Sequence, residues 1–94
     1  MVTAEPKAVR LSGSQVAYLK SARFLEPSLT QIVEAAEALE GDSHIVRVAR
    51  DVAEQFRAAF TDRLAKVGFD AQYELTDEGR MLEDLIDRFH YDYR

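Results

Sequence analysis

Four carboxylates are the side chains of this sequence best suited to chemistry. Glu34 and Glu37 are three positions apart, and so are Asp84 and Asp87, which would place each pair on one face of a helix. Carboxylate oxygens are the ligands that magnesium and manganese prefer, and facing helices can hold such an ion between them. Carboxylates that face solvent have another role, because they attract a positively charged partner. The spacing alone leaves both roles open.

Other catalytic groups are scarce. The chain has no cysteine, which excludes disulfides, zinc–thiolate sites and thiol catalysis. His44 and His90 do not fall in a zinc-binding spacing, and the four glycines are too scattered to form a phosphate-binding loop. We therefore assign no catalytic, cofactor-binding or metal-binding residue, and we expect a protein that is not an enzyme and needs no cofactor.

The two acidic pairs resemble the Glu-x-x-Glu and Glu-x-x-Asp motifs of the all-helical nucleoside-triphosphate pyrophosphohydrolases. The resemblance implies magnesium bound between helices, so a divalent-metal binder or hydrolase is the alternative function. The helical repeat favours the electrostatic role, because at about 100° per residue Glu34 and Asp84 lie opposite the apolar faces of their helices. We expect Glu34, Glu37, Asp84 and Asp87 to face water and to contact a partner.

One charged residue, Arg63, interrupts an apolar helix face. It lies on the same side of the helical repeat as Ile45, Val52 and Phe56. A buried guanidinium without a partner is costly, so Arg63 must extend past the helix end or pair with a carboxylate of a neighbouring helix or subunit. We predict a buried ion pair at Arg63, with a ligand or partner site around it as the alternative.

The element that positions these residues is a long helix over about residues 43–67. Apolar residues recur every three or four positions from Ile45 to Val67, and Gly68 follows as a stop signal. Such a helix carries an apolar stripe that other helices or a second chain must cover. The sequence therefore predicts an all-α fold, a small bundle of three to four helices built around this central helix.

Three capping patterns place the flanking helices. Ser12 and Ser28 each precede a glutamine by three positions, as in a capping box. Thr76 precedes two acidic residues, which suit the first turn of a helix. Because residues 41–43 make a short link, we expect helices two and three to form an antiparallel hairpin.

The chain divides into an arm and one domain. Residues 1–11 contain Pro6 and show no periodicity, so we expect a flexible N-terminal arm with at most a short extended piece at Ala8–Leu11. The remaining length suits one small core. We expect a single helical domain over residues 12–94.

The segment from Tyr73 to Leu82 resembles a junction in winged-helix regulators, where the last wing strand ends and a threonine caps the next helix. It carries the pattern Tyr-x-Leu-Thr-x-x-Gly-Arg-x-Leu. The resemblance implies a DNA-associated regulator, which is our second alternative function. Only residues 68–72 separate the long helix from this segment, which leaves little room for a wing hairpin.

Composition and charge narrow the classes of function. The net charge is −5, and no apolar run is long enough to cross a membrane. The N-terminus lacks the apolar block of a secretion signal, so we expect a soluble cytoplasmic protein that does not bind membranes. An acidic chain lacks the basic face that displaces counterions from nucleic acid, so we do not expect nucleic acid as the partner.

The negative charge is concentrated in two blocks. Residues 26–46 carry five acids and no base, and residues 70–94 carry eight acids and three bases. Complementary potential favours a basic protein partner for such surfaces. We expect a small acidic, non-enzymatic protein-interaction module, such as an immunity or antitoxin-like protein that covers a basic partner. Because the apolar arc of the long helix is wider than one neighbouring helix covers, we also expect a homodimer.

Overall fold

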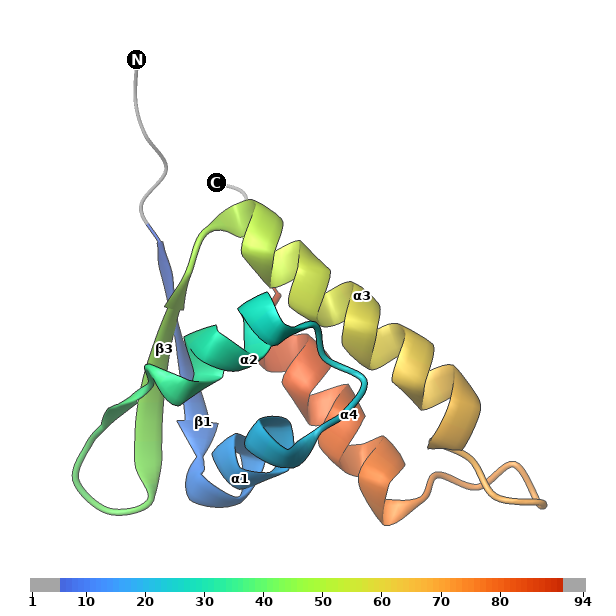
Figure 1. Cartoon of the computed structure of the whole chain (residues 1–94). Helices are drawn as coiled ribbons and strands as arrows, with labels where there is room; N and C mark the ends of the chain where they lie inside the picture. Colours follow the sequence, from blue (N-terminus) through green and yellow to red (C-terminus); the bar gives the residue numbers. More distant parts are fainter. Residues whose placement is uncertain (1–5, 91–94) are drawn as a thin grey trace.

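The computed structural model describes residues 6–90, which form four helices and a three-stranded antiparallel sheet (Figure 1). In chain order the elements are β1 (Lys7–Ser12), α1 (Gly13–Ser21), α2 (Pro27–Glu34), β2 (Glu37–Ala38), β3 (Ser43–Val48), α3 (Arg50–Val67) and α4 (Asp77–Arg88). The prediction of an all-α bundle is therefore wrong, and the fold is mixed α/β.

The sheet has the strand order β1-β3-β2. β1 pairs with β3 along its whole length, from Lys7 opposite Val48 to Ser12 opposite Ser43. The short strand β2 pairs with the other edge of β3, and α1 and α2 lie in the chain between β1 and β2. Residues 39–42 make the turn of the β2–β3 hairpin, where Gly41 adopts φ +71°, a value that glycine tolerates best.

The central helix predicted over residues 43–67 is divided between a strand and a helix. Residues 43–48 form β3, and α3 begins only at Arg50. In β3 the buried Val46 and Val48 flank the exposed Arg47, which is the two-residue repeat of a strand. The β-branched residues in this stretch favour extended backbone, but their spacing also fits a helix, so periodicity alone could not separate the two.

β1 occupies the second part of the stretch, residues 1–11, that we expected to be a flexible arm, and residues 1–5 lie outside the described residues. Val9 and Leu11 point into the core and are buried, whereas Ala8 and Arg10 are exposed. Two inward apolar residues gave too short a pattern to indicate a strand without its partner β3. The extended piece suggested at Ala8–Leu11 lies inside this strand.

The capping signals differ in accuracy. Ser12 caps α1 in a complete capping box with Gln15, and Thr76 caps α4, as predicted. The cap predicted at Ser28 is wrong, because α2 starts at Pro27 and its N-cap is Glu26, two residues before Ser28, which makes no side-chain cap bond. Proline is favoured in the first turn of a helix, where its missing N–H costs nothing.

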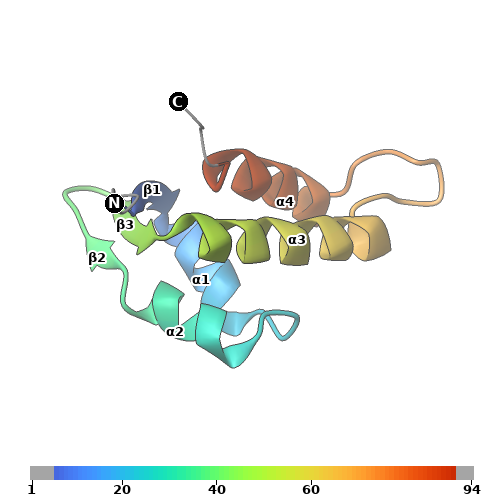
Figure 2. The same ribbon diagram turned by 90° about the horizontal axis from the view of Figure 1, so that it is seen from above.

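The long helix α3 packs against α4, not against α2. The two helices run side by side and antiparallel, joined by the loop at residues 68–76 (Figures 1 and 2). Phe56 and Phe60 of α3 meet Phe89, with ring centroids 4.5 and 5.4 Å from it, and all three rings are fully buried. The predicted hairpin of helices two and three is therefore wrong.

The apolar stripe of α3 is covered within the chain. Ala53, Phe56 and Phe60 are buried in the same core as residues of the sheet, α1, α2 and α4. This stripe therefore does not by itself require a second copy. Within residues 6–90, no helix is both long and apolar enough to cross a membrane.

Candidate functional site

The β2–β3 hairpin and the end of α2 carry a run of exposed acids, Glu34, Glu37, Glu40 and Asp42, which we call the acidic hairpin. Arg47 of β3 forms an ion pair with one of them, Glu37, with its Nη2 3.6 Å from Glu37 Oε2. Both side chains of this pair are more than half exposed, so the ion pair is weak. The acidic hairpin therefore keeps a clear excess of negative charge.

A hollow of about 340 Å³ lies beside the acidic hairpin, between α2 and the sheet. Its apolar lining comes from Ile32 and Ala35 at the end of α2 and from Ile45 and Val46 of β3, and Glu37 and Arg47 complete it. Leu39, in the hairpin turn, is an exposed large apolar side chain. An apolar centre with charged residues around it is the usual anatomy of a protein interface.

Glu34 and Glu37 do not lie on one helix face as their spacing suggested. α2 ends at Glu34, and Glu37 is already in β2. Both side chains are exposed and belong to the acidic hairpin, with Glu34 at the end of α2 and Glu37 in β2. No group of three histidine or acidic side chains in residues 6–90 is arranged to hold a metal ion. The motif resemblance to the metal-dependent hydrolases thus has no matching geometry on α2.

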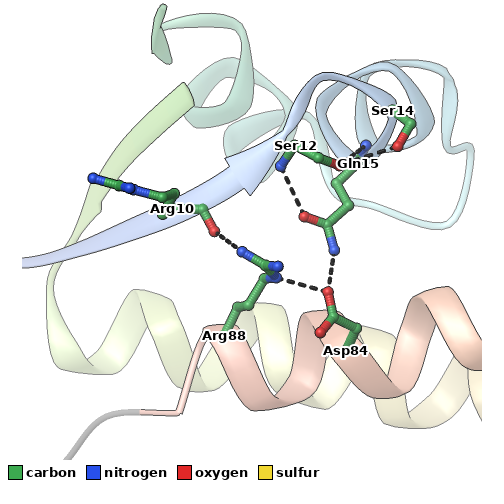
Figure 3. Close-up of polar contacts among 6 residues, drawn as sticks. All are labelled: Arg10, Ser12, Ser14, Gln15, Asp84 and Arg88. Carbon is green, nitrogen blue, oxygen red and sulfur yellow. Dashed lines mark hydrogen bonds and ion pairs between the residues drawn. The ribbon is translucent and has the colours of Figure 1, made fainter. Parts of the chain in front are cut away.

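Asp84 is engaged inside the molecule (Figure 3). Its Oδ2 accepts a hydrogen bond from the Gln15 amide and another, at 2.6 Å, from Arg88 Nε. Gln15 also accepts from the Ser12 amide, and Arg88 donates to the carbonyl of Arg10 at 2.6 Å. This network ties β1 and α1 to α4. Asp84 therefore cannot offer both carboxylate oxygens to a partner, because Oδ2 already accepts two hydrogen bonds.

Asp87, the other predicted contact on α4, is exposed. No side-chain hydrogen bond or ion pair within residues 6–90 involves it. The structure thus separates the four predicted contacts into an exposed pair on the acidic hairpin, the exposed Asp87 on α4, and Asp84, whose side chain is 49% exposed but is bonded to Gln15 and Arg88.

Arg63 forms an ion pair with Glu78 of α4, and the Arg63 Nε–Glu78 Oε2 distance is 3.0 Å. The side chains are 35% and 31% exposed, so the pair is partly open to water. Tyr18 of α1 donates its hydroxyl to the same Glu78 oxygen at 2.6 Å. These three residues join α1, α3 and α4.

The contacts at this cluster shift two pKa values in opposite directions. The hydrogen bond from Tyr18 and the neighbouring Arg63 guanidinium lower the pKa of Glu78. Burial, with the hydrogen bond to the Glu78 carboxylate, raises the pKa of Tyr18 well above its ordinary value. Glu78 is therefore ionised and Tyr18 neutral at physiological pH.

Sequence reasoning did not single out several residues that these sites use. Tyr18 and Glu78 were not identified as partners of Arg63, because residues from α1, α3 and α4 meet only in the folded chain. Glu40 and Asp42 were not named as contacts, although the run of five acids without a base in residues 26–46 was a signal for them.

Comparison of the chain with protein-family models, curated proteins and solved structures finds no match.

Proposed function

We propose that this chain is a non-enzymatic interaction domain that binds a basic protein segment at the acidic hairpin. The observation that carries the proposal is the run of exposed acids Glu34, Glu37, Glu40 and Asp42, of which Glu37 lines an apolar hollow. An immunity or antitoxin-like role, in which the domain covers a cationic partner, is one form of this function. The cytoplasm is the compartment we propose, and a chain that has no cysteine and so no disulfide is compatible with it.

The charge of the acidic hairpin supports a basic partner. Clustered carboxylates at one surface raise the rate of encounter with a cationic segment and select against acidic ones. The hollow supports a segment that also carries an aliphatic side chain, because Ile32, Ile45 and Val46 offer it an apolar contact. A lysine- or arginine-rich segment with one leucine-like residue matches both features.

Fluorescence anisotropy with a labelled peptide of lysines around a central leucine tests the proposal. We expect the double variant Glu34→Gln/Glu37→Gln to bind the peptide about tenfold more weakly, because two attractive charges are lost. The matched control Glu83→Gln/Asp87→Asn removes the same charge from α4 and should bind like the original chain. Equal weakening in both variants would reject the acidic hairpin as the binding site.

A second candidate, a DNA-associated regulator, is favoured by one observation. α1 and α2 are joined by the five-residue link 22–26 and are followed by a β-hairpin, an order similar to that of helix-turn-helix DNA-binding domains. Charge opposes it, because the exposed charged residues from Glu26 through the hairpin turn are acidic. A gel shift with duplex DNA at physiological salt distinguishes the candidates, and we expect no retarded complex.

The expected homodimer stays a prediction. The surface that we propose for a dimer is the outer face of α3, where small residues such as Ala58, Thr61 and Ala65 line a shallow hollow. Light scattering of the purified chain tests the homodimer, and a measured mass equal to that of a single chain would exclude it.

A further inference from the structure

A second hollow, of about 430 Å³, opens between the end of α1 and the α3–α4 pair. It is lined by Tyr18, Ser21, Ala22, Arg23, Phe24, Arg63 and Glu78. It shares no residue with the acidic hairpin. Two arginines and one glutamate give this lining a net positive charge, in a chain whose overall charge is −5.

Arg63 enters this hollow with its guanidinium held in place. Nε is bonded to Glu78, and the guanidinium carbon lies 5.5 Å from the centre of the Phe24 ring. Phe24 is itself packed edge-on against the buried Phe60, with 6.5 Å between ring centroids. The same guanidinium also donates a hydrogen bond to the hydroxyl oxygen of Tyr18. A guanidinium has five N–H donors, so Arg63, held by Glu78 and Tyr18, still has donors left to bind two oxygens of one anion.

Arg23 supplies a second positive charge to the same hollow. It lies in the link between α1 and α2, it is exposed, and no ion pair within the described residues involves it. Glu78 does not cancel this charge, because its Oε2 already accepts from both Tyr18 and Arg63. One positive charge is thus left without a counter-ion from the chain.

We propose that this hollow binds a small oxyanion, a phosphate or carboxylate group. Two of the anion's oxygens would accept from the terminal nitrogens of Arg63, and Arg23 would contact it from the link. The hollow is larger than the anion alone, so the group can be carried on a small organic molecule. This ligand class is independent of the basic segment proposed for the acidic hairpin, and either proposal can fail without the other.

The test is a titration of the full chain, followed by backbone amide NMR at constant ionic strength, with inorganic phosphate and separately with acetate. We expect saturable shifts at residues 18–24, at Arg63 and at Glu78. Tighter binding of phosphate than of acetate would identify a phosphate site, and the reverse order would identify a carboxylate site.

Four variants localise the anion. We expect Arg23→Ala and Arg63→Lys each to weaken binding about fivefold to tenfold, the second because lysine keeps the charge but loses the two-pronged geometry. Glu78→Gln should tighten binding, because it removes the competing carboxylate while an amide oxygen can still accept from Tyr18. Lys20→Ala removes a neighbouring exposed base that does not line the hollow and should bind like the original chain. Shifts that rise linearly without saturation, or equal losses in Lys20→Ala and Arg23→Ala, would overturn the proposal.

Discussion

Gln15 is a buried polar residue whose side-chain oxygen and nitrogen bind different partners. Its side-chain oxygen completes the capping box with the Ser12 amide, and its nitrogen donates to Asp84 of α4. Only 4% of Gln15 is exposed, so water cannot easily replace a lost partner. Asp84 therefore supplies the hydrogen-bond acceptor for the buried Gln15 amide. The sequence had predicted only a partner contact at Asp84.

This arrangement predicts unequal effects for the two aspartates of α4. Asp84→Ala should lower the free energy of unfolding by about 1–3 kcal/mol, because the buried amide of Gln15 loses its acceptor. Asp87→Ala should change it by less than about 0.5 kcal/mol, as is usual for an exposed side chain, because the Asp87 side chain makes no hydrogen bond or ion pair within residues 6–90. Urea unfolding measures both, and similar losses in the two variants would contradict the network in Figure 3.

The Tyr18–Glu78–Arg63 cluster predicts a contribution to acid stability. The pKa of Glu78 is below its ordinary value of 4.5 in the folded chain. Its contribution is therefore fully present above the unfolded-state pKa and is lost as the pH falls through the lower, folded-state pKa. We expect Glu78→Gln to lose less stability than the original chain between about pH 5 and pH 3. Thermal melts along this pH series measure the difference, with Glu83→Gln as a control that keeps the original pH dependence.

The helices were more predictable than the strands because their signals are local. The capping box at Ser12 and the cap at Thr76 involve residues three positions apart, so the sequence displays them directly. β1 and β3 are stabilised by each other across more than thirty intervening positions, and the six residues of each are too few for an unambiguous repeat. The same limit hid the acidic hairpin, because Glu34 and Glu37 fit a helical spacing equally well.

The N-terminal turn of α4 depends on a close approach of backbones. A Cβ atom built on Gly79 would lie 2.3 Å from the carbonyl oxygen and 2.9 Å from the Cα atom of Gly68, at the end of α3. The loop closes there through a hydrogen bond from the Thr76 amide to the Gly68 carbonyl, at 2.8 Å. Gly79 therefore serves the contact between α3 and α4, although its helix propensity alone is unfavourable.

Gly79→Ala is accordingly expected to destabilise the chain by about 1–3 kcal/mol, because the added methyl group forces the backbones apart. Propensity alone would give the opposite sign, a gain of about 1 kcal/mol for alanine in a helix. Urea unfolding decides between the two, and Glu83→Ala provides an alanine substitution on the exposed side of the same helix. An increase in stability for Gly79→Ala would refute the close approach.

The whole molecule has two ends with different character. At one end the sheet and α2 present the acidic hairpin, and at the other the α3–α4 pair extends to the loop at residues 68–76 (Figures 1 and 2). The core joins them through Phe56, Phe60 and Phe89. The overall charge could be calculated from the composition. The position of Glu37 at an apolar hollow depends on strand β3 and could not be predicted from the sequence.

Salt dependence follows from this distribution of charge. If the acidic hairpin binds a basic segment, the affinity should fall about tenfold or more between low salt and several hundred millimolar salt, because exposed charges are screened over about 10 Å at 0.1 M. A peptide in which serine replaces the central leucine should also bind more weakly at every salt concentration, since it loses the apolar contact. Affinity that is independent of salt would contradict an electrostatic partner surface.

The most direct measurement is an amide NMR titration of the chain with the lysine–leucine peptide. We expect saturable shifts confined to residues 32–47, the end of α2 and the β2–β3 hairpin. Shifts centred on α4 around Asp87, or spread evenly over every acidic surface, would contradict it.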